Sequence, residues 1–102
     1  MAVTTATRSP ALPDIPTVGE FVAGYEASFW GGLGVPKNTP VDVVEKLNKE
    51  IGAALANPTM QARLADFGGT SLAGSPAEFG KFMADETAKW AKVIRFAAIN
   101  AE

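Results

Sequence analysis

The sequence predicts an α/β fold, α+β for the isolated fragment, with three main helices and two or three short strands. Three observations predict it. Helix start signals, a proline directly after a capping residue, occur three times. Apolar residues recur every three or four positions after each signal. Two runs of β-branched and aromatic residues precede the first helix. At 102 residues the chain is one domain at most, spanning 1–102.

The amino-terminal third is predicted to be extended. Residues 2–7 are short and β-branched, which favours a strand. Residues 9–16 hold three prolines, which lack the backbone N–H, so this stretch is predicted to be a loop. Thr17 and Glu20 have the spacing of a capping box around one short helical turn.

A second strand is predicted for residues 26–35, where aromatic and branched residues gather. Three glycines interrupt it, at Gly31, Gly32 and Gly34. A phosphate-binding loop would place such glycines before a helix, with Lys-Ser/Thr after them. Here Val35 and Pro36 follow instead, so the glycines favour a bulge or a close approach of backbone to a neighbour.

The first helix is predicted for residues 40–56, with Thr39 as its cap and Pro40 at its first position. Its apolar residues share one face at helical spacing. They are Val43, Val44, Leu47, Ile51, Ala54 and Leu55.

Two further helices follow. Asn57 caps a short helix, residues 58–67, which Gly68 ends in the left-handed conformation. Residues 70–73 are predicted to be a short strand or an extended link. Ser75 and Glu78 then form a capping box that starts the last helix, residues 76–98. Its apolar stripe consists of Phe79, Phe82, Met83, Trp90, Val93, Ile94 and Ala97.

Composition excludes several function classes. The chain has no Cys and no His, so disulfides, thiol chemistry and imidazole catalysis or ligation are absent. The net charge of −2, with both signs interspersed, argues against nucleic acid as a partner. No apolar run approaches the ~20 residues of a membrane span, so we expect no membrane insertion. We also expect no cofactor, no metal, no catalytic residue and no enzymatic activity.

The acidic pair Asp85 and Glu86 does not change this expectation. Neighbouring residues on a helix point about 100° apart, and Lys81 and Lys89 lie four residues from Asp85. Exposed carboxylates paired in this way are typical of a solvated helix face.

Ligand-binding candidates gather at the first predicted strand. Arg8 follows it and can hold a carboxylate through a two-pronged contact. Thr4 and Thr5 offer hydroxyls beside it, as does Thr7. The alternative is an exposed loop arginine with no ligand.

The adjacent aromatic residues Phe29 and Trp30 provide a further candidate. Adjacent residues of a strand face opposite sides, so one of the two is expected to pack inward while the other points out. Both readings stay open for Trp30, which either packs under the helices or lines a ligand pocket.

Four stretches resemble one known family. Residues 12–20 (LPDIPTVGE), 34–40 (GVPKNTP), 74–79 (GSPAEF) and 86–94 (ETAKWAKVI) are similar to the carboxyl-terminal part of the Bug-type solute receptors, the extracytoplasmic binding proteins of tripartite tricarboxylate transporters. The likeness extends from Ala2 to Glu102. Residues 21–24 (FVAG) depart from it, because the family commonly has a Gly-Val-Pro-Gly turn there.

The resemblance implies part of one lobe of a periplasmic-binding-protein-like fold. It implies binding of a small organic carboxylate in a cleft, delivery to a membrane permease, and a periplasmic location. Residues 1–10 have one Arg and no apolar core, so they do not make a signal peptide, and the chain as written is expected to be cytoplasmic.

The family's other lobe and its glycine-rich first loop have no counterpart in this sequence. We therefore expect a truncated receptor with weak or no autonomous binding. Its uncovered apolar surface and strand edges predict a homo-oligomer, a dimer with swapped elements. The alternative function is a small homodimeric interaction or structural protein that has lost solute binding.

Overall fold

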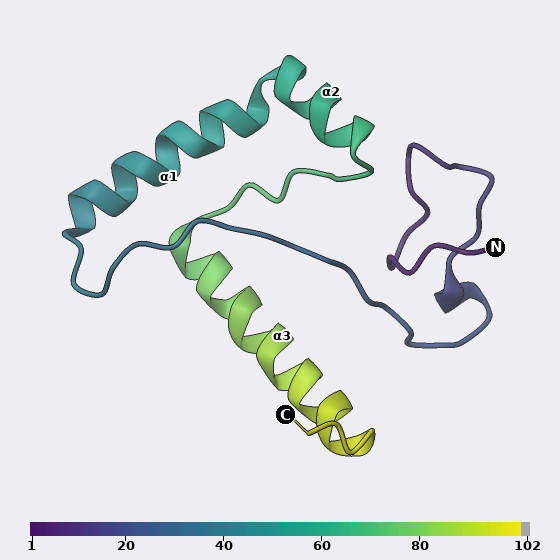
Figure 1. Cartoon of the computed structure of the whole chain (residues 1–102). Helices are drawn as coiled ribbons and strands as arrows, with labels where there is room; N and C mark the ends of the chain where they lie inside the picture. Colours follow the sequence, from purple (N-terminus) through teal and green to yellow (C-terminus); the bar gives the residue numbers. More distant parts are fainter. Residues whose placement is uncertain (101–102) are drawn as a thin grey trace.

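The computed structural model describes residues 1–100 and contains three α-helices joined by long extended segments (Figure 1). The helices are α1 (Val41–Ala56), α2 (Pro58–Asp66) and α3 (Pro76–Phe96), preceded by one 3₁₀ turn, η1 (Val18–Glu20). The amino-terminal loop lies at one side of the molecule, and a single extended segment leads from it past the start of α3 to α1. The three predicted helices are confirmed. The predicted domain range 1–102 ends outside the described residues.

The helix start signals act as the sequence predicts. The Ser75 hydroxyl accepts the Glu78 N–H at 3.1 Å, and the Glu78 carboxylate accepts the Ser75 N–H at 2.8 Å. Thr17 and Glu20 form the same reciprocal pair around η1. The Asn57 side chain accepts the N–H groups of residues 59 and 60 at the start of α2. Each cap satisfies N–H groups that lack a partner inside the helix, so the bounds follow from local chemistry.

The start of α1 differs from the prediction by one residue. Pro40 is the N-cap and makes no side-chain cap bond. The Thr39 hydroxyl donates to the Pro36 carbonyl at 2.7 Å instead of capping the helix. Asn38, with φ of 68°, completes a tight turn between Pro36 and Thr39. Because this turn uses the hydroxyl that was predicted to cap, α1 begins at Val41.

The ends of α2 and α3 share one hydrogen-bond pattern. At α2 the N–H groups of Gly68 and Gly69 donate to the carbonyls of Ala65 and Leu64, both at 2.8 Å. At α3 the N–H groups of residues 98 and 99 donate to the carbonyls of residues 95 and 94. The residue at the turning point is left-handed in both, with φ of 75° at Gly68 and 52° at Ala98. This closure ends α3 at Phe96, two residues before the predicted end.

The predicted strands differ most from the structure. Within residues 1–100 the β pairing consists of one parallel bridge between Val3 and Thr17. The Ala27 N–H donates to the Thr4 carbonyl at 2.9 Å. Residues 2–7 and 26–35 therefore form no ladder among the described residues, and residues 70–73 form the extended link that was the alternative to a strand. A strand needs a neighbour about 4.8 Å away, and these segments have none along most of their length.

The apolar faces of the helices meet only in part. No apolar side chain is buried among the described residues, and Thr17, 3% exposed, is the one residue in the buried class. A side-chain bond from Asn48 to the Gly74 carbonyl, 2.8 Å, ties α1 to the segment before α3. The radius of gyration is 16.6 Å, whereas a compact domain of this length has about 13 Å. The expected exposure of apolar surface is confirmed.

Hydropathy along the helices is moderate. Within the part of the chain that the structure describes, no helix is both long enough and apolar enough to cross a membrane.

Replacing Ala98 by glycine is expected to stabilise the end of α3. An L-residue in the left-handed region costs about 1 kcal/mol that glycine does not pay. Ala98→Gly should raise the free energy of unfolding by that amount, measured by urea denaturation followed by circular dichroism. The matched control is Ala97→Gly, since Ala97 has φ of −82° and gains nothing from glycine. Equal effects of the two variants would contradict this assignment.

Candidate functional site

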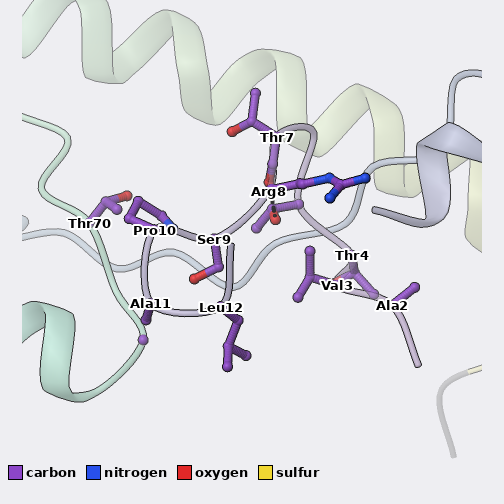
Figure 2. Close-up of a pocket in the computed structure, with 12 residues that line it drawn as sticks. Ala2, Val3, Thr4, Thr7, Arg8, Ser9, Pro10, Ala11, Leu12 and Thr70 are labelled. Atoms are coloured by element: carbon purple, nitrogen blue, oxygen red, sulfur yellow. Dashed lines mark hydrogen bonds between the residues drawn. The ribbon is translucent and has the colours of Figure 1, made fainter. Parts of the chain in front are cut away.

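The candidate site is an open depression of about 410 Å³ on the amino-terminal loop. Residues 2–12 supply most of its wall, and the stretch after α2 closes one side through Gly68 and Thr70 (Figure 2). Thr4, Thr5 and Arg8, three of the four predicted ligand residues, lie on this wall, together with Thr7. The structure thus brings together the candidates that lie close in sequence.

Local hydrogen bonds shape this loop. The Leu12 N–H donates to the Ser9 carbonyl at 3.0 Å, and the Ile15 N–H donates to the Leu12 carbonyl at 3.1 Å. The Thr5 hydroxyl donates to the Thr7 carbonyl at 2.7 Å. The loop returns to its start where the Val3 N–H donates to the Pro16 carbonyl at 2.9 Å. The prolines between these turns restrict the backbone, so the loop is held without a packed core.

Arg8 forms a salt bridge with Glu20. Its Nε donates to Glu20 Oε1 and its Nη2 donates to Glu20 Oε2, both at 2.8 Å. Nη1 points to the Pro13 carbonyl at 3.4 Å. Figure 2 shows the guanidinium extending toward the short turn that carries Glu20. Arg8 is therefore neither a free loop arginine nor an unoccupied anion site, because a carboxylate from its own chain already fills the two-pronged contact.

The Glu20 carboxylate links Arg8 of the loop to the capping box at Thr17. Its Oε1 also accepts the Thr17 N–H at 3.1 Å, so one carboxylate serves both the capping box and the arginine. The hydrogen bond from Arg8, helped by the Thr17 N–H and opposed by partial burial, lowers the pKa of Glu20 from 4.5 to about 2. The same bond raises the pKa of Arg8. Both side chains stay well exposed, 47% for Arg8 and 39% for Glu20.

The Arg8–Glu20 pair was missed by sequence reasoning. Glu20 was assigned only to the capping box, and it lies 12 residues from Arg8, too far along the chain for a contact within one helical turn or one tight turn. The available signal was the proline-rich loop between them, which turns the chain back so that its ends meet.

Trp30 lies elsewhere and does not line this depression. Its ring packs edge-on against Phe79, with centroids 5.8 Å apart, and against Phe82, 5.0 Å apart. Phe29 is 99% exposed, so the expected alternation of the two aromatic residues is confirmed. The ligand-binding role of Trp30 stays a prediction.

Gly32 is placed against the ring of Phe79, and a Cβ there would collide with it. The expected close approach of the glycine segment to a neighbour is confirmed at this position. Gly31 and Gly34, in contrast, face open space.

A polar cluster fastens the extended segment to α3. Lys89 Nζ lies 2.7 Å from Glu26 Oε2 and 3.6 Å from Glu86 Oε1. Trp90 Nε1 donates to Glu86 Oε2 at 2.9 Å. The hydrogen bond from Lys89 lowers the pKa of Glu26 and raises that of Lys89. This cluster positions the segment that carries Trp30.

The acidic pair on α3 matches the solvated-face prediction in part. Lys81 Nζ and Asp85 Oδ2 are 2.6 Å apart, and both side chains are more than half exposed. Lys89 bonds Glu26 rather than Asp85. Among residues 1–100, no three acidic side chains converge in the manner of a metal site.

Comparison with known proteins places this architecture in a family. The model of the tripartite tricarboxylate transporter family receptor matches residues 1–99. A UPF0065 protein from the tcbD–tcbE intergenic region of Pseudomonas sp. strain P51 is 37% identical over 103 residues, covering 99% of this chain and 31% of that protein. Protein BugT of Bordetella pertussis is 33% identical over 98 residues, covering 93% and 29%.

Two solved structures are similar. R. palustris Rpa4515 with adipate has a TM-score of 0.86 and 37% identity, covering 97% of this chain and 33% of that one. The periplasmic binding protein BugD has a TM-score of 0.85 and 35% identity, covering 99% and 35%. The chain therefore spans about a third of the length of each of these four relatives.

Because Arg8 and Glu20 form a salt bridge, the stability of the loop is predicted to depend on pH. Because the folded-state pKa of Glu20, about 2, lies below its ordinary value of 4.5, the pair stabilises the loop fully above about pH 5. That stabilisation is lost as the pH falls toward 2. The protection of the η1 amides, taken as the intrinsic exchange rate at each pH divided by the observed rate, should fall over this range. Glu20→Gln keeps a capping acceptor and should remove the dependence. A carboxyl resonance of Glu20 that titrates near 4.5 would contradict the pair.

Gly32→Ala is expected to disturb the aromatic cluster. The new Cβ forces the Phe79 ring away and weakens its edge contact with Trp30, a loss of about 1 kcal/mol. Thermal unfolding and the near-ultraviolet circular dichroism of the tryptophans measure it. Gly31→Ala faces open space and is the control, with no loss expected. A Gly32→Ala protein with unchanged tryptophan signal would contradict the packing of Phe79 on this backbone.

Proposed function

We propose, because this chain belongs to the tripartite tricarboxylate transporter family of receptors, that it forms part of a solute receptor for small organic carboxylates. One observation carries the proposal. Its backbone superimposes, with a TM-score of 0.86, on a third of a receptor solved with adipate. The work is capture of a solute and its delivery to a membrane permease, in the periplasm, with no bond broken.

We propose that the solute-facing residues are Thr4, Thr5 and Arg8. The Thr4 hydroxyl and the Arg8 Nη1, which makes only a 3.4 Å contact with Pro13, can donate to a carboxylate, and the Thr5 hydroxyl can do so once it leaves the Thr7 carbonyl. Glu20 already balances the charge of Arg8, so long-range attraction for an anion is small. Affinity therefore depends on short hydrogen bonds from several sides.

The isolated chain supplies only one wall of such a site. Small-molecule sites bury most of the ligand surface, whereas this depression of about 410 Å³ opens to solvent along a single loop. We therefore propose a truncated receptor module with weak or no autonomous binding. The remaining contacts would come from the two thirds of a receptor that this chain does not span.

A second candidate function is a small homodimeric interaction protein. Exposed apolar side chains favour it, among them Phe29, Phe67 and Phe96 at 99%, 90% and 95% exposure. Light scattering and calorimetry separate the two candidates. A stable dimer at micromolar concentration that binds no organic acid in any context favours the second.

A chimaeric receptor tests the first candidate. The third of Rpa4515 that matches this chain is replaced by residues 1–102, and adipate, tricarboxylates and aromatic acids are titrated calorimetrically. We expect the chimaera to bind a dicarboxylate, while the chain alone binds with a dissociation constant weaker than about 1 mM. Replacing Thr4 and Thr5 by valine should cost the chimaera about tenfold in affinity, because the Thr4 donor is lost and the loop also loses the bond from the Thr5 hydroxyl to the Thr7 carbonyl.

The control for this experiment is Thr59→Val, because Thr59 lies on α2 and does not line the depression. A folded chimaera that binds none of the acids would overturn the proposed function. Equal losses from the Thr4/Thr5 pair and from Thr59 would overturn the assignment of the residues.

A further inference from the structure

One backbone hydrogen bond joins the extended segment before α1 to the wall of the depression. The Ala27 N–H donates to the Thr4 carbonyl at 2.9 Å, and Thr4 lines the depression. The preceding residue, Val3, is held by residues 16 and 18 instead, through two bonds of 2.9 Å. The backbone position of Thr4 therefore depends on where Ala27 is held.

Glu26, the residue next to Ala27, is bound at both of its carboxylate oxygens. Its Oε2 accepts a hydrogen bond from Lys89 Nζ at 2.7 Å, and its Oε1 accepts one from the Ser28 hydroxyl at 3.2 Å. Lys89 lies on α3 and also approaches Glu86, whose Oε1 is 3.6 Å from Nζ. The bond between Lys89 and Glu26 spans 63 residues of sequence, so it fixes the extended segment to α3 directly beside Ala27.

Trp30 gives the segment a second anchor on α3. Its ring packs edge-on against Phe79 and Phe82. Residues 28 and 29, each with two rotatable backbone dihedrals, separate Trp30 from Ala27, whereas Glu26 is bonded to Ala27 directly. The aromatic anchor therefore restricts Ala27 less than the anchor at Glu26 does.

We infer that Glu26 and Lys89 are positioning residues for the solute site, because they hold Ala27 where its N–H fixes Thr4 in the wall. The inference rests on the proposed function, in which Thr4 contacts the solute. Neither Glu26 nor Lys89 lines the depression, so both act through Thr4. A wall that is held in place before a carboxylate arrives has less freedom to lose on binding, and this raises the affinity.

Amide hydrogen exchange of Ala27 in the full chain tests the connection to Thr4 without any solute. Lys89→Met removes the ammonium group, and the protection of the Ala27 amide should fall. Lys89→Arg keeps a cationic donor and should retain the protection. Helix content, measured by circular dichroism, should be the same in both variants, because α3 keeps its own backbone bonds.

The matched control is Lys81→Met. Lys81 also bonds an acid, Asp85 at 2.6 Å, but that pair lies within α3 at positions four residues apart. Its loss should leave the protection of the Ala27 amide at the value of the unmodified chain.

A double-mutant cycle tests whether the two positioning residues act through one bond. Glu26→Gln removes the carboxylate charge and keeps an acceptor for the Ser28 hydroxyl. The double variant Glu26→Gln/Lys89→Met should lose no more Ala27 protection than Lys89→Met alone, because each change removes the same contact. Losses that add would overturn the assignment of the pair.

The chimaeric receptor measures the effect on the solute. Lys89→Met in the chimaera should weaken adipate binding about threefold, as a wall that has to be ordered on binding implies. Lys89→Arg should bind adipate like the unmodified chimaera, and so should Lys81→Met.

Two further results would overturn the inference. They are equal Ala27 protection in Lys89→Met and Lys81→Met, and an adipate affinity of the chimaera that Lys89→Met leaves unchanged. A chimaera that binds none of the acids, with Ala27 protection lost in Lys89→Met alone, would overturn the proposed function while supporting Lys89 as the residue that fixes Thr4. The two failures are therefore distinguishable.

Discussion

An extended backbone needs a partner, and this constraint governs the whole molecule. A helix satisfies its N–H and C=O groups internally, so α1, α2 and α3 form wherever the local signals place them. The extended segments between them cannot do so. Residues 28–35 and 70–73 keep their backbone groups open, and the apolar faces of the helices stay partly uncovered because no sheet formed by residues 1–100 lies beneath them. The spread shape, with a radius of gyration of 16.6 Å, is the consequence.

Among the described residues, polar contacts and one partly exposed aromatic cluster around Trp30 hold the segments together in place of a buried core. Arg8, Glu20 and Thr17 fasten the amino-terminal loop through one shared carboxylate. Lys89 fastens the extended segment to α3 through Glu26. These contacts are exposed, and exposed ion pairs contribute little to stability. They set positions, while the larger hydrophobic contribution has to come from surfaces that this chain leaves open.

Sequence reasoning predicted the elements that depend on interactions between residues close together in the chain. Capping by Ser75, Asn57 and Thr17 depends on residues within three positions, and sequence predicted each of these caps. The start of α1 was misplaced because Thr39 had a competing local acceptor at Pro36. The strands were predicted from composition, which indicates a preference for extended backbone but not whether a neighbour is present. The Arg8–Glu20 pair depends on how a proline-rich loop turns back, and no periodicity encodes that. The family resemblance is confirmed by the receptor model that matches residues 1–99.

The most direct test is residue-resolved amide hydrogen exchange on the chain alone, at a concentration where light scattering reports a monomer. Because residues 28–35 have no backbone partner, we predict near-random-coil exchange rates from Ser28 to Val35 and clear protection in α3. Protection of that stretch equal to the protection in α3 would show a paired strand within one copy, and it would contradict the account.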